Sequence, residues 1–593
     1  MAQKQKLELT WIGKEKRAHL EPRILLEDVE KSLHAERRVS GNDIFENLLI
    51  FGDNLLALKT LEQDFTGKIK CIYIDPPFNT GQAFEYYDDG VEHSLWLALM
   101  RDRLVLLRAL LSNDGSLFVH IDDNELGYLV VLLDEIFGRD NRLYIVTFKQ
   151  GSATGHKAIN PGCVNTSNFI LIYAKSKPDW KPNRVFTARE RDKRYGQFIL
   201  NRDEDHTSWR FTTVVKAFAE SLGMTPTEAK RTYEDYGERL DRFALENAER
   251  VMQLARPDYE AVSAAARAVI DESRQNRSRI YLLERDDHSD MYFIGGQRIL
   301  FYSDKVKVID GVPTVGEPLT TLWDDILSNN LHKEGGVEFP KGKKPEALIK
   351  RVLDLATEPG DWVLDSFAGS GTTGAVAHKM GRRWIMVELR EHCHTLIMPR
   401  LSRVINSGDA EGVTDTIGWK GGGGFRYYRL APSLLERDRF GNYVISKQYN
   451  AAMLAEAMCK QMAFAYAPSD TFYWQHGHST EQDFIYVTTQ TLSREQLHKL
   501  SDEVGPQRSL LVCCSAYRTK SDAFPNLNLT KIPQAVLDRC EWGKDDYSLN
   551  VANLPQMAPS QPEAVSSGNG SRADRRARSQ MALFGIESGG AGE

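Results

Sequence analysis

The feature of this sequence that most constrains its fold is an alternation of short apolar runs with stretches of helical spacing, in two separate blocks. In the first block, the apolar runs within 47–61 and 68–75 and at 115–122 are each followed by a turn and a helical pattern. The second block, 361–389, has the order strand, glycine loop, helix, strand. Strands that alternate with helices form largely parallel sheets. We therefore expect an α/β fold with a doubly wound, mostly parallel sheet.

Changes in this pattern divide the 593 residues into six predicted segments. They are a charged helical N-terminal segment (1–45), the first half of the α/β domain (46–150), an inserted, largely helical domain (151–320), the second half of the α/β domain (321–420), a C-terminal α+β domain (425–550) and a disordered tail (551–593). The insert is expected to be helical because Thr225 and Glu228 form a capping box around Pro226. Apolar residues also recur at helical spacing beyond it: Leu240, Phe243, Ala244, Ala248, Val251 and Ala255. Gly421 to Gly424 predict a hinge before the C-terminal domain.

Composition places the chain among ordinary globular proteins. Hydrophobic residues make up 41% and charged residues 26%, and the net charge of -7 gives no global sign of a polyanion partner. A local basic groove can still bind nucleic acid in an acidic protein. The seven cysteines are scattered, so we expect neither disulfides nor a zinc site. No apolar run reaches about 18 residues, and the N-terminus lacks an apolar signal segment. These features predict a cytoplasmic protein without a membrane span.

The glycine loop of the second block predicts a cofactor site. Residues 365–374 read Asp-Ser-Phe-Ala-Gly-Ser-Gly-Thr-Thr-Gly, and Glu388 ends the next strand. This spacing fits a dinucleotide site in which the acid binds ribose, whereas Ala375 and Val376 exclude a phosphate-binding loop. Asp365 would repel a pyrophosphate but attract the ammonium of S-adenosylmethionine (SAM), so SAM is favoured. A tight turn whose glycines only permit close packing is the structural alternative.

In the first block, an apolar strand runs directly into Asp75, Pro76, Pro77 and Phe78. Proline cannot donate to a sheet, so the strand must stop there. Methylation of an exocyclic amine is favoured by two acceptors at its N–H bonds. The Asp75 carboxylate and the Pro76 carbonyl could supply them, and Phe78 offers a surface for stacking. A base in a duplex must be flipped out to reach such a site. Taken alone, Asp-Pro-Pro also fits an ordinary turn.

Together the two motifs resemble those of the β-class amino-methyltransferases that act on DNA, and most of all the modification subunits of type III restriction-modification systems. The order of catalytic motif, recognition insert and cofactor loop is also similar. Three further segments resemble these subunits: FGDNLLALK (51–59), HIDDNE (120–125) and FPKGKKPEALIKRVL (339–353). Phe78 stands where tyrosine is commoner, so any hydrogen bond from a phenol is absent.

The resemblance implies SAM-dependent methylation of the N6 amine of adenine, with Asp75, Pro76, Pro77 and Phe78 at the base. It implies a cofactor site formed by Asp53, Lys344, Pro345, Asp365, Phe367, Gly369, Gly371, Thr372, Thr373 and Glu388. It further implies no metal, double-stranded DNA as substrate, a homodimer, and a separate restriction subunit with helicase and nuclease activity. The protein would then act in the cytoplasm, at the nucleoid.

The insert and the tail predict contacts with partners. Basic residues that could contact DNA phosphates are those of 188–194 with Lys230, Arg231, Arg277 and Arg279, although a solvated face explains any single one. In the tail, Gln580 to Phe584 resembles the peptide that binds the bacterial sliding clamp. Three functional alternatives stay open: methylation of cytosine N4, a DNA-recognition and assembly subunit that binds SAM without catalysis, and an NAD-dependent oxidoreductase.

Histidines near the motifs have simpler explanations. His120, Asp122 and Asp123 could suggest acid–base or metal chemistry, but a strand end that leads into a helix cap explains them. His392 and His394 lie on a predicted helix and point to different faces, so we expect no metal site there.

Overall fold

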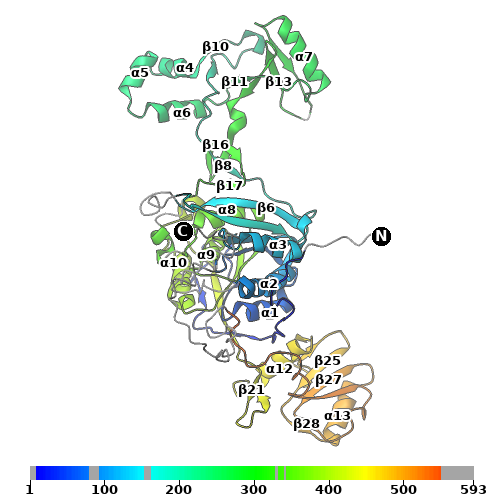
Figure 1. Ribbon diagram of the computed structural model, residues 1–593. Helices are drawn as coiled ribbons and strands as arrows, with labels where there is room; N and C mark the ends of the chain where they lie inside the picture. Colours follow the sequence, from blue (N-terminus) through cyan, green and yellow to red (C-terminus); the bar gives the residue numbers. More distant parts are fainter. Residues whose placement is uncertain are drawn as a thin grey trace, which may run out of the picture. The chain divides into compact units, whose positions relative to one another are not determined.

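An 11-stranded, mostly parallel sheet forms the centre of the α/β domain (Figure 1). The computed structural model describes residues 8–78, 93–151, 162–286, 288–326, 331–339 and 342–548. The strands are β1 (Leu25–Glu27), β2 (Leu33–His34), β3 (Asn47–Phe51), β4 (Ile69–Ile74), β5 (Leu111–Ile121), β6 (Arg142–Lys149), β7 (Ser167–Ala174), β17 (Leu322–Trp323), β18 (Trp362–Asp365), β19 (Arg383–Glu388) and β20 (Gly424–Leu430). Their order is β1-β20-β3-β19-β18-β4-β5-β7-β6-β17, and β2 pairs with β20. The strands from β20 to β5 run parallel, which confirms the predicted fold class.

Helices cover both faces of this sheet (Figure 1). One face carries α1 (Asn54–Phe65), α2 (His93–Leu110) and α3 (Leu126–Phe137), and the other carries α8 (Glu346–Ala356), α9 (Thr372–Lys379) and α10 (Met398–Ile405). Along β4, Cys71 and Tyr73 pack in the core with α8 to α10, while Ile72 and Ile74 pack with α1 to α3. Successive side chains of a strand point to opposite faces. Burial on both faces therefore explains the uninterrupted apolar run of β4.

The chain leaves β18 and β4 in opposite directions, so these strands flank a topological switch point. β18 leads through α9 to β19 on one side, and β4 leads through α2 to β5 on the other. The two strands are parallel neighbours, with Val363 opposite Cys71 and Leu364 opposite Ile72. Asp365 and Asp75 therefore leave the sheet at the same edge. In open α/β sheets, ligands bind in the crevice outside such strand ends.

Two predicted domain boundaries are wrong because strands beyond them join the central sheet. β7 lies in the predicted insert but pairs with β5 and β6, so the first half of the α/β domain reaches Ala174. β20 pairs with β3, so the second half reaches Leu430. The glycines at 421–424 are not a hinge: the Gly422 amide donates to the Ile405 carbonyl, and Gly424 begins β20.

The N-terminal segment is also different from its prediction. Its described part, residues 8–45, contains no helix, and Leu25–Glu27 pairs with β20 as an edge strand. The outer edge of β20 would otherwise present unpaired backbone groups, which an extended segment can satisfy. Pairing with β20 therefore outweighs the charged composition that suggested a helix.

The insert is mixed α/β and not largely helical. Its strands form an antiparallel six-stranded sheet, β10-β9-β11-β14-β13-β12, and a three-stranded sheet, β15-β16-β8. The strands are β8 (Phe186–Ala188), β9 (Gln197–Ile199), β10 (Phe211–Thr213), β11 (Val251–Ala255), β12 (Ile280–Leu283), β13 (Met291–Ile294), β14 (Gln297–Phe301), β15 (Val306–Ile309) and β16 (Val312–Pro318), and the helices are α4 (Val214–Ser221), α5 (Pro226–Thr232), α6 (Tyr236–Glu246) and α7 (Ala264–Gln275). The capping box of Thr225 and Glu228 is confirmed at the start of α5. Only the first part of the apolar run at helical spacing is a helix: α6 ends at Glu246, and Val251 and Ala255 belong to β11, which pairs within the sheet.

The C-terminal domain has the predicted α+β character. A five-stranded sheet, β23-β24-β25-β27-β29, packs with α12 and α13. Its elements are β21 (Leu435–Arg437), β22 (Tyr443–Ile445), α12 (Ala451–Gln461), β23 (Ala465–Tyr466), β24 (Gly477–His478), β25 (Asp483–Val487), β26 (Thr491–Leu492), α13 (Arg494–Val504), β27 (Ser509–Cys514), β28 (Ala516–Tyr517) and β29 (Leu527–Lys531). The predicted disordered tail, with Gln580 to Phe584, lies outside the described residues. Among the described residues, no helix has the length and apolar surface that a membrane crossing needs.

Asn47 ties three strands together and provides a test of this architecture. Its side chain accepts from the Trp384 amide of β19 at 2.9 Å and donates to the Gly424 carbonyl of β20 at 2.8 Å. Asn47→Ala leaves both groups buried without these partners, so we expect the free energy of unfolding to fall by about 2–4 kcal/mol. Chemical denaturation followed by tryptophan fluorescence measures this change. The control is Asn42→Ala, at an exposed loop position; equal denaturation midpoints for the two variants would contradict the assigned role.

Candidate active site

The carboxyl end of β4 places Asp75 beside Lys344, which precedes α8. Lys344 Nζ lies 2.6 Å from Asp75 Oδ2, while Oδ1 is buried and accepts no hydrogen bond from any described residue. Burial raises the pKa of the Asp75 carboxyl, and the ion pair with Lys344 opposes this shift. Lys344 thus holds the carboxylate by one oxygen and leaves the other as an acceptor for a ligand.

The rim after Asp75 is held by α2 and by His120. Trp96 Nε1 donates to the Pro77 carbonyl at 2.7 Å, where the two prolines already restrict the backbone. The Phe78 ring lies 5.9 Å from the His120 ring, with an interplanar angle of 22°. The residues that follow Phe78, Asn79-Thr80-Gly81 of the motif among them, lie outside the described part of the chain.

His120 belongs to this site, although the sequence suggested only a strand end. It is fully buried, and its Nδ1 lies 3.0 Å from the Tyr73 hydroxyl. Burial, with a smaller effect from Lys344, holds the pKa of His120 well below its usual value, so the imidazole is neutral. The sequence carried a usable signal: β5 is the parallel neighbour of β4, and Val119 lies opposite Ile74. A polar residue at the end of β5 must therefore lie beside Asp75.

Asp365 organises the turn between β18 and α9. Its Oδ1 accepts from the Phe367 amide at 2.9 Å and its Oδ2 from the Thr373 hydroxyl at 2.6 Å. Burial raises the pKa of Asp365 to about 7; the two hydrogen bonds oppose the shift, and Asp75 and Glu388 add to it. Within the described ranges, no lysine, arginine or histidine forms an ion pair with Asp365. A cationic ligand such as SAM would supply the missing positive charge, so the residues fit this cofactor.

The glycine loop depends on backbone conformations that favour glycine. Gly369 and Gly371 have φ angles of +53° and +75°, in the left-handed region. A Cβ atom at Gly371 would also approach Ile397 Cγ2 to 3.0 Å. Glycine at 371 is therefore required both by the turn and by the close approach of the helix that follows β19.

Glu388 braces this loop in the structure. Its Oε2 accepts from the Gly369 amide at 2.9 Å, and its Oε1 accepts from the amides of Leu389 at 2.9 Å and Arg390 at 3.1 Å. His392 Nε2 lies 3.1 Å from Oε2. The predicted contact with a ribose would therefore be added to bonds that already position the loop.

Asp53 and Asn54 mark the start of α1 at the same edge of the sheet. Asp53 Oδ1 caps the helix by accepting from the amides of Leu55 and Leu56. Its Oδ2 accepts from the Tyr547 amide at 2.9 Å. Asn54 Nδ2 donates to the Ser366 carbonyl at 2.8 Å. Both carboxylate oxygens of Asp53 thus already accept hydrogen bonds from backbone amides. The neighbouring Asn54 is the residue that contacts the glycine loop.

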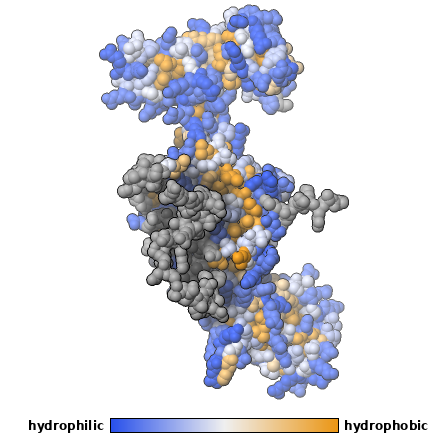
Figure 2. All heavy atoms as spheres, in the orientation of Figure 1, coloured by the Kyte–Doolittle hydropathy of each residue, from blue (hydrophilic) through white to orange (hydrophobic). Residues whose placement is uncertain are grey.

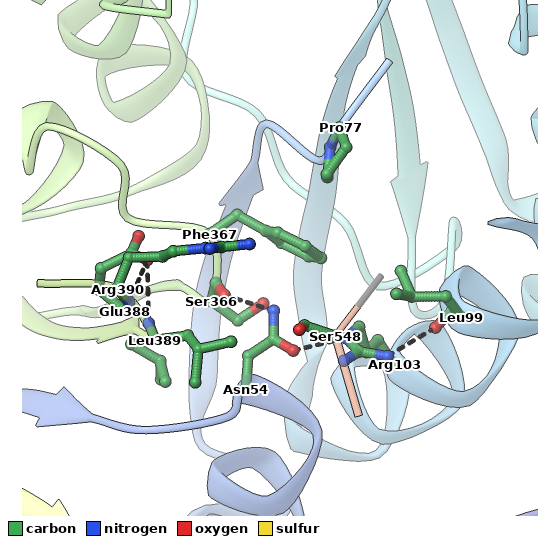
Figure 3. A pocket seen from close by; sticks show the side chains of 11 residues that line it. Asn54, Pro77, Leu99, Arg103, Ser366, Phe367, Glu388, Leu389, Arg390 and Ser548 are labelled. Atoms are coloured by element: carbon green, nitrogen blue, oxygen red, sulfur yellow. Dashed lines mark hydrogen bonds between the residues drawn. The ribbon is translucent and has the colours of Figure 1, made fainter. Parts of the chain in front are cut away.

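A small cavity lies between these elements, as Figure 3 shows. It is lined by Asn54, Pro77, Leu99, Arg103, Ser366, Phe367, Val387, Glu388, Leu389, Arg390 and Ser548. Pro77 comes from the first motif and Phe367 from the second, so the two motifs share one cavity. Of the other predicted cofactor residues, Lys344 faces Asp75 and Pro345 caps α8.

Thr372 connects the loop to a buried charge network beneath it. Arg400 Nη1 donates to the Thr372 hydroxyl at 2.7 Å, and Arg400 Nη2 donates to Glu346 Oε1 at 2.6 Å. Lys379 Nζ lies 2.7 Å from both Glu346 Oε2 and Asp409 Oδ2. All four charged side chains are fully buried. The network fixes the loop from α8, α9 and α10 together.

Arg400 should therefore be essential to the stability of the loop. Arg400→Met leaves Glu346 with one cationic partner in the core, and we expect a loss of about 3–5 kcal/mol in the free energy of unfolding. Arg403→Met is the matched control, because Arg403 is an exposed arginine on the same helix. Thermal and chemical denaturation measure both variants; similar losses in the two would refute the importance of the network.

This chain matches one protein-family model and several curated proteins. Residues 69–399 match the model of the N6_N4_Mtase family, described as DNA methylase. The chain is 34% identical over 428 residues to the probable type III restriction-modification enzyme HindVI Mod subunit of Haemophilus influenzae, which covers 68% of this chain and 56% of that protein. It is 28% identical over 452 residues to the type III restriction-modification enzyme EcoPI Mod subunit of Escherichia phage P1, which covers 68% of this chain and 65% of that protein.

The chain thus spans less than two thirds of the length of these two relatives. A solved structure, the M1.HpyAVI–SAM complex, matches with a TM-score of 0.29 and 13% identity over 60% of this chain and 98% of that chain. The family match covers more than half of the 593 residues and contains both the Asp-Pro-Pro-Phe rim and the glycine loop. The chain therefore belongs to the DNA methylase family.

Proposed function

We propose that this protein transfers a methyl group from SAM to the N6 amine of adenine in DNA, as the modification subunit of a restriction-modification system. The observation that carries the proposal is the placement of Asp75 and Asp365 at one edge of the sheet, on neighbouring parallel strands. The Asp75 carboxylate, which could accept from an amine, and the Asp365 carboxylate, which has no ion pair among the described residues, thereby follow neighbouring strand ends. Membership of the DNA methylase family and the type III Mod subunits among the relatives support the same activity.

The rim of β4 would bind and activate the amine. Asp75 Oδ1 accepts one N–H of the amine, and the Pro76 carbonyl accepts the other, which favours a nitrogen with an available lone pair. Lys344 keeps the carboxylate oriented through Oδ2. Bound SAM would supply an electrophilic methyl group. Because Phe78 lies beside His120, the extruded base would stack on a ring whose position is already held.

The glycine loop would hold the cofactor. Asp365 attracts the ammonium group, Phe367 and Asn54 form the cavity walls, and Gly369, Gly371, Thr372 and Thr373 shape the turn around it. Lys344 acts on Asp75 in this proposal and not on the cofactor directly. Pro345 contributes by starting α8, which carries Glu346 beneath the loop.

The insert would read the DNA target. Its visible face is mostly hydrophilic (Figure 2), and five of the proposed basic residues are exposed and form no ion pair with any described residue: Lys193, Lys230, Arg231, Arg277 and Arg279. Among the other basic residues proposed for phosphate contacts, Arg191 is already paired with Asp241 and Arg194 with Asp192. The five exposed residues without an ion pair among the described residues are therefore the better candidates, because forming a phosphate contact breaks no existing ion pair.

The same proposal implies that this protein binds partner proteins. A modification subunit would act with a separate restriction subunit that supplies helicase and nuclease activity, and it would form a homodimer. Gln580 to Phe584 is proposed to bind the sliding clamp. A pull-down with purified clamp, comparing the full chain with one that ends at Ser579, tests this contact; equal retention of both chains would exclude it.

Asp75→Ala tests the catalytic proposal. Removing the acceptor should lower the turnover number by at least about 10²–10³-fold, while DNA binding stays within about twofold of the wild type. Purified protein is incubated with SAM and duplex DNA, and the digested nucleosides are identified by mass. N6-methyladenine is expected; N4-methylcytosine would change the base assignment, and no methylated base would overturn the function. Asp114→Ala, at an exposed position of β5, serves as the control.

The raised pKa of Asp365 predicts how SAM binding depends on pH. Since the pKa is about 7, the carboxyl is protonated below that pH and loses its attraction for the ammonium. The Kd for SAM should therefore fall about tenfold as the pH rises from 5.5 to 7.0. Isothermal titration in matched buffers measures the profile. Asp365→Asn, which cannot ionise, should flatten it, and an unchanged slope in this variant would contradict the assignment.

A further inference from the structure

A chain of hydrogen bonds crosses three adjacent strands beside the rim that carries Asp75. His120 lies near the end of β5, which has β4 on one side and β7 on the other. Its Nδ1 lies 3.0 Å from the Tyr73 hydroxyl of β4, and its Nε2 lies 3.2 Å from Asn168 Nδ2 of β7. All three side chains are buried. The imidazole is therefore held at both nitrogens.

Two aromatic rings pack against the same imidazole. Phe148 of β6 is fully buried and meets it edge to face, with 5.5 Å between the ring centroids and an interplanar angle of 78°. Phe78 lies nearly parallel to it, at 5.9 Å and 22°, and is only half-buried. Among the described residues, His120 is the one ring on which Phe78 stacks. His120 therefore supports the surface that is proposed for the extruded base.

The hydrogen bonds of His120 also determine where its proton lies. An amide nitrogen can only donate, so Asn168 Nδ2 donates to Nε2. A neutral imidazole then carries its proton on Nδ1 and donates it to the Tyr73 hydroxyl. A second proton, on Nε2, would bring two donors face to face. Asn168 thus favours the uncharged ring.

The other groups around the ring act in the same direction. Burial, and to a smaller extent the charge of Lys344, hold the pKa of His120 well below its usual value. The Tyr73 hydroxyl stays neutral, because burial raises its pKa well above the usual value. The two phenylalanines and Asn168 carry no charge. Lys344 is therefore the charged group that acts on the imidazole, and it opposes protonation.

An uncharged support suits the transfer of a methyl group to an amine. The reaction moves positive charge from the sulfonium of SAM onto the amine nitrogen, and Lys344 already places one cation 2.6 Å from Asp75. A second buried cation, at His120, would oppose this movement, because like charges repel strongly where water is excluded. Groups that are oriented before the charge develops favour the transition state.

We propose that Asn168 and His120 are positioning residues for the extruded base: Asn168 keeps His120 oriented and uncharged, and His120 supports the Phe78 ring on which the base stacks. This inference rests on the proposed function, which supplies the base and the methyl donor. Asn168 lies outside the two motifs on which the catalytic assignment is based. Both residues act on kcat through Phe78 and leave the affinity for SAM unchanged.

The pH dependence of kcat in Asn168→Asp tests this role. The new carboxylate accepts from Nε2 and stabilises the charged imidazole, so it raises the pKa of His120 and the ring becomes charged as the pH falls. With saturating SAM and duplex DNA, the ratio of kcat at about pH 8.5 to kcat at about pH 6.0 should be at least about fivefold larger in the variant than in the wild type. Asn42→Asp, at an exposed position, should keep the wild-type ratio.

A second variant decides the question if Asn168→Asp does not fold. His120→Ala removes the support of Phe78, so kcat should fall at least about tenfold, while the Kd for SAM, measured by isothermal titration, stays within about twofold of the wild type. His498→Ala, which changes an exposed histidine of the C-terminal domain, is the control and should keep the wild-type kcat.

Three results would overturn the positioning role. They are a wild-type pH ratio in a folded Asn168→Asp, a wild-type kcat in His120→Ala, and a loss of SAM affinity in His120→Ala as large as its loss of kcat. Failure of the wild-type protein to methylate DNA would instead overturn the proposed function, and this inference with it.

Discussion

Parallel pairing between β4 and β18 brings together two chain segments that are far apart in the sequence. Val363 lies opposite Cys71 at the centre of the sheet, where both strands are buried on both faces. The strand ends therefore have no freedom to separate, and Asp75 and Asp365 must share one edge. Every contact of the site is built on this pairing: the rim with Lys344, the glycine loop with its charge network, and the cavity between them.

The site places three carboxylates at neighbouring strand ends and stabilises each in a different way. Asp75 is paired with Lys344, Glu388 accepts from backbone amides of the loop, and Asp365 has two hydrogen bonds but no ion pair among the described residues. Burying an ionised group is costly unless charge or hydrogen bonds compensate for it. The unequal compensation explains why Asp365, and not its neighbours, is suited to a cationic ligand.

Much of the α/β domain could be predicted from its sequence because both the strand runs and the glycine loop are local patterns. The meeting of the two motifs also followed, since parallel strands share their carboxyl edge. The pairing of β7 with β5 and of β1 with β20 could not be predicted, because these partners are distant in the chain and no local pattern identifies them.

The same reason explains what could not be predicted in the site. Lys344 was expected at the cofactor, and the sequence carries no sign that it faces Asp75. Ser548 was not predicted, because it follows a segment without helix or strand. His120 differs, because its place at the end of β5 was readable once β5 was placed next to β4. The insert was predicted to be helical from one well-capped helix and a run of apolar residues at helical spacing, although its sheet depends on antiparallel pairing that spacing alone does not reveal.

The central sheet also constrains how the protein is made. β4 cannot acquire its neighbour β18 until roughly 290 further residues have been synthesised, which takes about 15–60 s at 5–20 residues per second. During that time an apolar strand has one edge without its partner, and such edges favour aggregation. Translation of this chain therefore creates a period in which chaperones have an exposed strand to protect.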